Sequence, residues 1–347
     1  MKVVIAMSGG VDSSVAAALL KEEGHEIIGA TMRLMPGGSD AETDAENIAR
    51  RLGIPHHVMD FTYSFARRVV ENFLREYNTG RTPNPCIRCN KYIKFGVLME
   101  KAKEMGAEVI ATGHHARVER DNTTGKYLLK KGIDTYKDQS YFLCQLKQEQ
   151  LSRVMFPIGN LTKDKVRQIA RRLKLPVAGR PESQEICFIP DGNYPQFLKN
   201  HNAGAVTPGP IFDEEGNTLG EHRGILSYTI GQRRGLGIAA AEPLYVTAID
   251  PEKNAVIVGT KDRTYGTELV VNNLNWIARP RPEYPVTVKA RVRYRHPEAE
   301  ASVTPMNEAQ VLVKFASPQM AITPGQTIVF YDGDTVIGGG TILRQGR

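Results

Sequence analysis

The sequence predicts an α/β fold: a doubly wound parallel sheet, followed by two small β domains. In the first half of the chain, apolar strand-like runs alternate with helix-like runs, a pattern typical of βαβ crossovers in a parallel sheet. After about residue 202 the helical periodicity fades, and glycine and proline separate short β-rich runs. We therefore predict three domains, over residues 1–202, 203–265 and 266–347.

The parallel sheet and its helices follow from this alternation. The predicted strands span 2–7, 26–32, 56–61 and 108–113, and the predicted helices span 13–23, 41–52, 65–77 and 92–105. A further helix is expected over 162–173, with Thr162 as its N-cap. That helix is strongly basic, which suits either a solvated face or a contact with RNA. In such a fold, ligands bind beyond the carboxyl ends of the strands.

The C-terminal β elements are predicted from turns and from two-residue alternation. Strand pairs are expected at 246–259 and at 328–342, the second with a hairpin turn at residues 332–334. Within 286–295 apolar residues occupy the even positions, so one face of the strand is expected to be core. The odd positions include Lys289, Arg291, Arg293 and Arg295. We predict that these four cations form a row that tracks phosphates.

Composition narrows the class of protein. The 347 residues are 41% hydrophobic and 24% charged, which is ordinary for a soluble globular protein. A net charge of +7 and a pI near 9.1 favour a polyanionic partner. No run approaches the roughly eighteen apolar residues of a membrane span, and the N-terminus has no signal-peptide pattern. We therefore expect a cytoplasmic protein with no membrane partner.

A glycine loop follows the first predicted strand. Residues 8–13 read Ser-Gly-Gly-Val-Asp-Ser, a turn that directs backbone N–H groups and the positive end of a helix dipole at one point. Gly9 and Gly10 allow a phosphate to approach, and the hydroxyls of Ser8, Ser13 and Ser14 are expected to add donors. The common P-loop differs because it ends in Gly-Lys-Ser/Thr. The run resembles the pyrophosphate loop of the N-type ATP pyrophosphatases, which implies cleavage of ATP to AMP and pyrophosphate and adenylation of a substrate oxygen.

The chain has four cysteines, which a reducing compartment would keep from forming a disulfide framework. Cys86 and Cys89 form a Cys-x-x-Cys pair in a proline-stiffened loop, and Cys144 lies in an apolar run and is expected to be buried. A helix N-terminus near Cys89 would lower its thiol pKa. If Cys187 converges with Cys89 near an adenylate, one thiol can carry persulfide sulfur and the other can release it. Spacing alone is equally compatible with two unrelated structural thiols.

Several short motifs occur together and in order. They are Ser-Gly-Gly-Val-Asp-Ser-Ser from residue 8, Thr-Pro-Asn-Pro from residue 82 with Cys89-Asn90, Ala-Thr-Gly-His from residue 111, Lys-Asp-Gln-Ser-Tyr from residue 137, Cys187-Phe188, the run at 227–237 and Thr-Pro-Gly-Gln from residue 323. As a set they resemble the bacterial tRNA-specific 2-thiouridylases over nearly the whole chain. The resemblance implies ATP-dependent 2-thiolation of the wobble uridine in tRNAs for lysine, glutamate and glutamine. It also implies that the first domain is a pyrophosphatase domain and that the last of the two small β domains is a β-barrel.

The resemblance also implies roles for individual residues. Cys89 would be the nucleophile and Cys187 the persulfide carrier, with a disulfide between them forming as sulfur leaves, and Asp12 would be a third catalytic residue. ATP and Mg²⁺ would bind at Ala6, Met7, Ser8, Gly9, Gly10, Val11, Asp12, Ser13, Met32 and Gly113. Asn84, Pro85 and Cys86 would line the target base. Contacts with tRNA would come from His114, Lys137, Asp138, Gln139, Arg293, Tyr294 and Gln326. The sulfur donor would be a cysteine desulfurase, a sulfur-relay protein or sulfide.

The chain departs from the family in two places. Many members have Asp where this chain has Cys86, so thiolates of Cys86, Cys89 and Cys187 could hold a [4Fe–4S] cluster with one open iron for sulfide. The same thiols are compatible with zinc. The stretch 33–41 is short and lacks a cysteine, whereas many members have a longer loop there. Two rivals remain: another ATP pyrophosphatase that makes an amide on a small molecule, and a non-catalytic RNA-binding protein with a structural zinc.

Overall fold

A five-stranded parallel sheet forms the N-terminal part of the computed structural model, which describes residues 1–179, 186–189, 191–201 and 207–346. The strand order is β3-β2-β1-β4-β7, and every neighbouring pair is parallel. The predicted parallel sheet is therefore confirmed, and β7 is a fifth strand that the sequence reading missed. The strands are β1 (Lys2–Ala6), β2 (Glu26–Arg33), β3 (His56–Asp60), β4 (Val109–Ala111) and β7 (Val154–Met155).

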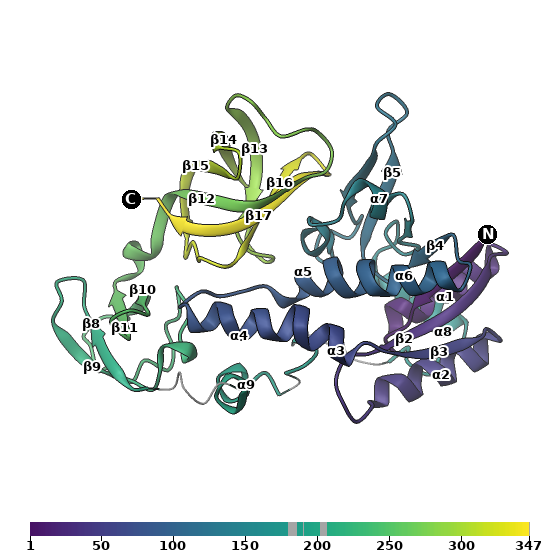
Figure 1. The fold of residues 1–347 in the computed structure, drawn as a ribbon, viewed down its shortest axis with the longest axis horizontal. Helices are drawn as coiled ribbons and strands as arrows, with labels where there is room; N and C mark the ends of the chain where they lie inside the picture. Colours follow the sequence, from purple (N-terminus) through teal and green to yellow (C-terminus); the bar gives the residue numbers. More distant parts are fainter. Residues whose placement is uncertain (180–185, 190, 202–206, 347) are drawn as a thin grey trace.

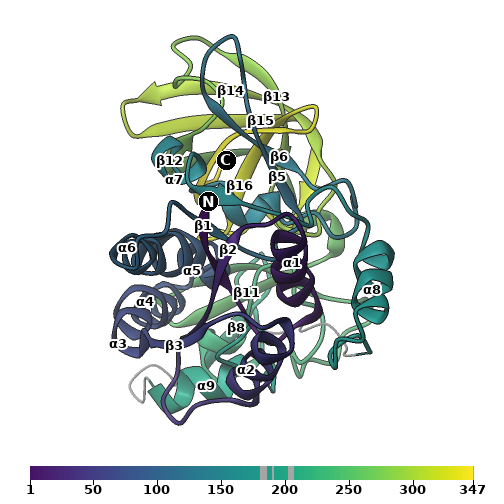
Figure 2. The same ribbon diagram turned by 90° about the vertical axis from the view of Figure 1, so that its right-hand side faces the viewer.

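Helices cover both faces of this sheet, as a doubly wound fold requires. Successive residues of β1 point to opposite faces, so Val3 and Ile5 pack against one helical layer while Val4 and Ala6 pack against the other. Figure 2 shows the two layers on opposite sides of the sheet. The first layer contains α1 (Val11–Glu22), α2 (Asp40–Leu52) and α8 (Lys163–Arg172). The second contains α3 (Thr62–Phe65), α4 (Glu71–Asn78), α5 (Pro85–Cys89) and α6 (Leu98–Glu104).

The second layer contains two π-helical segments. Ala66–Val70 joins α3 to α4, and Asn90–Val97 joins α5 to α6, so each pair forms one long helix. The second long helix begins at Pro85, because Pro85 occupies the first turn and the side chain of Asn84 accepts a hydrogen bond from the Ile87 N–H at 3.3 Å. The sequence reading treated this stretch as a loop, which is wrong from Pro85 onward. Proline here starts a helix and does not interrupt one.

A closed antiparallel barrel forms the C-terminal part, as predicted. Its order is β12-β15-β14-β13-β16-β17, and β12 pairs with β17 to close it. The turn between β16 and β17 is at Gly333, whose φ of 57° suits the predicted hairpin. The strands are β12 (Tyr265–Trp276), β13 (Val286–Arg291), β14 (Ala299–Asn307), β15 (Gln310–Met320), β16 (Thr327–Asp332) and β17 (Thr335–Gln345).

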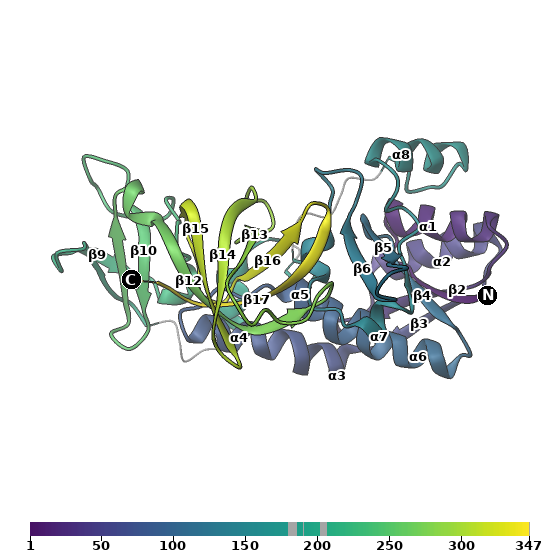
Figure 3. The ribbon, with the colours of Figure 1, turned by 90° about the horizontal axis from the view of Figure 1, so that it is seen from above.

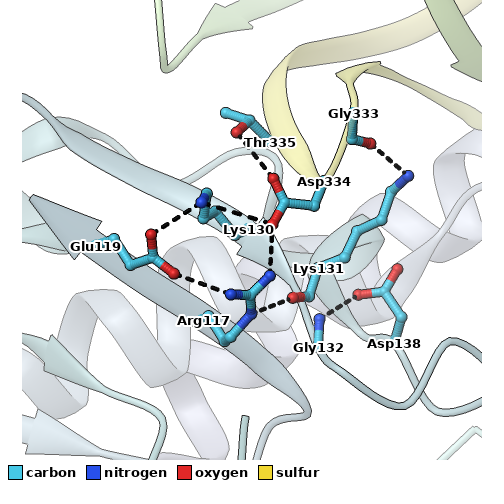
Figure 4. Close-up of polar contacts among 9 residues, drawn as sticks. All are labelled: Arg117, Glu119, Lys130, Lys131, Gly132, Asp138, Gly333, Asp334 and Thr335. Atoms are coloured by element: carbon cyan, nitrogen blue, oxygen red, sulfur yellow. Dashed lines mark hydrogen bonds and ion pairs between the residues drawn. The ribbon is translucent and has the colours of Figure 1, made fainter. Parts of the chain in front are cut away.

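A hairpin from the N-terminal part extends the barrel sheet. It consists of β5 (Ala116–Arg120) and β6 (Tyr127–Lys131), and β6 pairs with β17 through Lys130 and Thr335. Figure 4 shows the charged contacts at this junction. Arg117 Nη2 lies 2.6 Å from Asp334 Oδ2, and Lys131 Nζ donates to the Gly333 carbonyl at 2.9 Å. The N-terminal part and the barrel are therefore joined both by strand pairing and by ion pairs.

A small four-stranded sheet lies between the parallel sheet and the barrel in sequence. Its order is β10-β11-β8-β9. It lies at one end of the molecule and the parallel sheet at the other, with the barrel between them (Figures 1 and 3). The elements are α9 (Tyr194–His201), β8 (Gly209–Phe212), β9 (Thr218–His222), β10 (Tyr245–Asp250) and β11 (Ala255–Gly259). The residue limits of the three domains stay a prediction, and the limit at 202–203 lies outside the described residues.

The remaining helical elements are short. They are α7 (Gln148–Leu151) and 3₁₀ turns at Ser140–Leu143, Ile225–Ser227 and Lys261–Thr264. Within the described ranges, the chain has no helix that combines the length and apolar character needed to cross a membrane.

Candidate active site

The glycine loop connects β1 to α1 at the carboxyl edge of the parallel sheet. Gly9 has a φ of 69°, and a Cβ there would lie 2.7 Å from the carbonyl oxygen of Ala41 in α2. Gly10 is the N-cap of α1 and offers no side chain to the first turn. The first backbone N–H groups of α1 therefore receive no hydrogen bond from an N-cap side chain. Free N–H groups at a helix N-terminus are the arrangement that binds phosphate.

The serine hydroxyls in the loop have internal partners. Ser13 Oγ and Ser14 Oγ both donate to the Gly10 carbonyl, at 3.2 and 2.7 Å, and the Ser8 N–H donates to Ser13 Oγ at 3.2 Å. Ser14 is fully buried, so the expectation that its hydroxyl faces a phosphate is wrong in this structure. Ser8 is exposed. The hydroxyls of Ser13 and Ser14 therefore stiffen the loop.

Asp12 lies in the first turn of α1 and has two basic partners. Both of its carboxylate oxygens lie 2.7 Å from Lys163 Nζ, and Oδ1 lies 3.4 Å from His115 Nε2. Burial raises the pKa of Asp12, but the hydrogen bonds from His115 and Lys163 and their charges outweigh burial, so the net pKa is lowered. Asp12 is therefore a carboxylate beside the phosphate loop.

Lys163 was not identified from the sequence as a site residue. It begins α8, is only 7% exposed, and lies 151 positions from Asp12 in the chain. Thr162 caps the helix, as predicted, by accepting from the Lys165 N–H at 3.3 Å. The sequence reading counted Lys163 among the cations of a basic helix, and no local signal separates it from its exposed neighbours.

The other residues implied to bind ATP gather around this loop. Gly113 follows β4, and a Cβ there would lie 2.5 Å from the Ser13 nitrogen, so only glycine lets this strand end reach α1. Met32 is half-buried near the end of β2. The remaining residues continue β1 into α1: Ala6, Met7, Ser8, Gly9, Gly10, Val11, Asp12 and Ser13.

The thiols of Cys86, Cys89 and Cys187 come from two distant segments. Cys86 and Cys89 lie in α5, and Cys187 precedes a buried Phe188. The Phe188 ring packs edge-on against Phe65 and Phe73, with centroids 5.5 and 5.4 Å apart, which fixes the Cys187 segment on the second helical layer. All four cysteines are free, with Cys86 and Cys187 exposed and Cys89 and Cys144 buried. The predicted burial of Cys144 is confirmed.

The three thiols influence one another's pKa. Burial raises the pKa of Cys89 to about 12, with Lys94 opposing and Cys187 adding to the rise. Although part of Cys86 is exposed, the surrounding protein raises its pKa to about 11, and Cys187 adds to that rise. The predicted lowering of the Cys89 pKa is wrong, because burial of the thiol within a continuing helix raises the pKa more than nearby positive charge lowers it.

The three thiols do not form a ready ligand set for a cluster. Within the described part of the chain, no three His, Cys, Asp or Glu side chains are grouped so that they could hold a metal ion. Cys89 is 7% exposed and belongs to the core between the helices, whereas Cys86 is on the surface of the same helix. The predicted [4Fe–4S] or zinc site therefore does not fit this arrangement of thiols.

Two residues implied to contact tRNA lie inside the protein. His114 is 8% exposed, lies between the rings of Phe95 and Phe156, and its Nδ1 is 2.7 Å from Thr112 Oγ1. Burial lowers the His114 pKa well below its usual value. Asp138 is 3% exposed, and its carboxylate accepts hydrogen bonds from Gly132 and Ser140. Here both residues shape the loops beside the active site, and their contacts with tRNA stay predictions.

Three further residues are implied to contact tRNA, and one of them, Gln326, joins the barrel to the N-terminal part. Gln326 Nε2 donates to the Thr82 carbonyl at 2.9 Å, next to Asn84 and the buried Pro85. Gln139 Oε1 accepts from the His115 N–H at 2.9 Å. Lys137 is half-buried close by. Gln326 therefore reaches the segment implied to line the target base.

The predicted row of four cations is wrong. Strand β13 ends at Arg291, so the alternation that would align all four stops there. Arg291 pairs with Glu298 at 2.8 Å, and Arg293 donates to the Ile230 carbonyl at 3.0 Å and to the Thr323 hydroxyl. The Tyr294 ring lies 4.4 Å from that of Phe142. Arg291 and Arg293 therefore make contacts within the protein, while Lys289 and Arg295 are exposed.

Three family models match consecutive parts of the chain. They are described as the tRNA methyl transferase HUP domain (residues 1–191), the tRNA methyl transferase PRC-barrel domain (195–260) and the aminomethyltransferase beta-barrel domain (266–342).

Curated relatives match at full length. The chain is 51% identical to tRNA-specific 2-thiouridylase MnmA 1 of Caldanaerobacter subterraneus subsp. tengcongensis, over 100% of this chain and 99% of the relative. It is 50% identical to tRNA-specific 2-thiouridylase MnmA of Heliobacterium modesticaldum, over 99% and 92%, and 49% identical to that of Halothermothrix orenii, over 98% and 98%. The chain therefore belongs to the tRNA-specific 2-thiouridylase family.

Proposed function

We propose that this chain is an ATP-dependent sulfurtransferase that 2-thiolates the wobble uridine of tRNA. The observation that supports the proposal is that Phe188, the neighbour of Cys187, packs against Phe65 and Phe73 in the helical layer that also contains α5 with Cys86 and Cys89. Full-length relatives that are named for the same activity support it. An anticodon loop suits such an enzyme, because its bases leave the stack at low cost.

The phosphate loop would supply the activation step. Uridine O2 attacks the α-phosphorus of ATP, the bond to pyrophosphate breaks, and the N3 proton is lost. The first turn of α1 provides N–H donors for the phosphates, and Lys163, Asp12 and His115 form a charged group next to them. Mg²⁺, when bound, would neutralise phosphate charge, and Asp12 is the carboxylate positioned to hold it.

The two cysteines would supply the sulfur transfer. The terminal sulfur of a Cys187 persulfide attacks C2, and AMP leaves with the electron pair of the C2–O bond. The Cys89 thiolate then attacks Cys187 Sγ, the pair of the breaking S–S bond goes to the sulfur on C2, and a Cys89–Cys187 disulfide forms. An external dithiol returns the disulfide to two thiols. The persulfide would come from a cysteine desulfurase, a sulfur-relay protein or sulfide with an oxidant.

The test is thiolation in vitro with ATP, Mg²⁺, unmodified tRNA and a persulfide donor, read as 2-thiouridine by mass spectrometry and as AMP release. Cys187→Ser and Cys89→Ser should each abolish 2-thiouridine while ATP still binds. Normal thiolation in either variant would contradict the cysteine mechanism. AMP release that depends on a small amide acceptor and not on tRNA would favour the rival synthetase, and absence of ATP turnover would favour a binding protein.

A further inference from the structure

Lys94 lies in the π-helical segment that follows Cys89. Residues five apart are about one turn apart in a π-helix, so Lys94 comes one turn after Cys89. In an α-helix, the residue about one turn after Cys89 would instead be the fourth residue along, Ile93, which is fully buried. The π-helical geometry therefore brings a cation to the level of Cys89, and π segments in helices are frequent at functional sites.

Lys94 is half-buried, and among the described residues no carboxylate lies within ion-pair distance of it. Other enclosed lysines have partners: Lys91 Nζ bonds Gln145 Oε1 at 3.0 Å, and Lys131 Nζ lies 2.7 Å from Glu298. Among the described residues, the charge of Lys94 is therefore not neutralised by an ion pair. Such a position is explained if an anion forms beside it during function.

The charge of Lys94 acts on three thiols and on one buried histidine. That charge lowers the pKa of Cys86, Cys89 and Cys187 against the stronger effect of burial, which raises all three. It also lowers the pKa of His114, on which the Asp12 carboxylate acts in the opposite direction. Among the described residues, Lys94 is the cation that acts on each of these thiols. The anions that can form beside it are therefore sulfur anions.

We propose that Lys94 is the positioning residue of the sulfur site and supplies the counter-charge for the Cys89 thiolate and for the persulfide anion on Cys187. This inference deepens the proposed function and rests on it. Sulfur transfer requires first a persulfide anion on Cys187 and then a thiolate on Cys89, so a cation whose charge acts on both cysteines stabilises each state in turn.

The test is the alkylation of Cys187 and Cys89 in the reduced full-length chain, without ATP or tRNA, followed by mass spectrometry from pH 7 to 10. Lys94→Met keeps the apolar stem and removes the charge. We expect the rate for Cys187 at pH 8 to fall about three- to tenfold and its pH profile to move upward, as a change of half to one pKa unit would give. Lys94→Arg should restore the rate to within about twofold.

Lys91→Met is the matched control, because Lys91 lies on the same segment but bonds Gln145 and acts on Cys144. It should leave the Cys187 rate unchanged. A Lys94→Met chain that alkylates like the unaltered chain, or a Lys91→Met chain with the same loss, would overturn the proposal.

A second measurement needs no variant. In the unaltered chain, anionic iodoacetate should modify Cys187 faster, relative to neutral iodoacetamide, than it modifies free cysteine, because the ammonium attracts it. A ratio equal to or below that of free cysteine would overturn the proposal. Since neither reagent reports on ATP or tRNA, these outcomes are separate from the thiolation assay. If the chain does not thiolate tRNA, the proposed function is contradicted, but the alkylation rates can still be interpreted.

Discussion

The ammonium of Lys163 lies 2.7 Å from both carboxylate oxygens of Asp12. This contact joins the start of α8 to the start of α1, at the phosphate loop. Because Lys163 is almost fully buried, the ion pair with Asp12 compensates its charge. The pair therefore has a structural duty as well as a place beside the nucleotide.

We expect Lys163→Met to lower the free energy of unfolding at pH 7 by roughly 2–3 kcal/mol, because it leaves the Asp12 carboxylate with only a long contact to His115. Asp12 has a lowered pKa, so its contribution to stability is present above pH 3.8 and is lost as pH falls through the lower folded value. The variant should lose less stability on acidification. Urea denaturation at pH 7 and between pH 3 and 5 measures both effects, and Lys165→Met, on the exposed side of α8, is the control.

Gly113→Ala should weaken ATP binding at least tenfold. Its methyl group would lie 2.5 Å from the Ser13 nitrogen and 2.7 Å from the Asp12 carbonyl carbon, so α1 or the end of β4 must shift. Isothermal titration with ATP measures the loss. Gly179→Ala, whose added carbon meets nothing within 4 Å, should bind as the unaltered chain does. Equal affinities for the two variants would contradict the close packing of the phosphate loop.

Cys86→Asp and Cys86→Ser should both retain thiolation within about threefold. In the proposed mechanism Cys86 neither carries nor releases sulfur, so a carboxylate or a hydroxyl at this exposed position suffices. The assay is 2-thiouridine formation under air and under anaerobic conditions, with iron and sulfide measured in each preparation. Loss of activity together with loss of stoichiometric iron would restore the cluster mechanism.

Cys89 should alkylate far more slowly than a free thiol at pH 8. A pKa of about 12, against an ordinary value of 9.0, reduces the thiolate fraction by about a thousandfold. The same shift means that the folded state loses stability as pH rises from 9 toward 12, since burial of the anion is disfavoured. Timed labelling with mass spectrometry tests the rate. If Cys89 in the ligand-free chain reacts like free cysteine, its burial in solution differs from that in the structure.

The parts of the fold set by local pattern could be predicted from the sequence. The glycine loop is one, because Gly9 and Gly10 follow an apolar strand and precede a helix, and the barrel hairpin at Gly333 is another. Val288 and Ala290 are buried as their alternation predicted. In each case the determining residues lie within a few positions of one another.

The parts set by distant contacts could not be predicted. Nothing near Lys163 indicates that Asp12 is a partner, and nothing near Arg293 indicates that it will bond the Ile230 carbonyl. The prediction of a lowered pKa for Cys89 failed for the same reason, since burial by other elements raises the pKa more than the local helix dipole lowers it. The charge pattern of the sequence shows where the cations are, and tertiary packing determines which of them form contacts within the protein.

The β5–β6 hairpin has a consequence for the order in which the protein is assembled on the ribosome. Arg117 bonds Asp334, 217 positions later, and Lys131 bonds Gly333, 202 positions later. The hairpin lies 202 to 217 positions before these partners in the barrel, so during synthesis the edge of β6 stays unpaired until β17 has been made. Completion of the residues that form the parallel sheet therefore does not by itself give the nucleotide half its final shape, because the edge of the hairpin still lacks its neighbour.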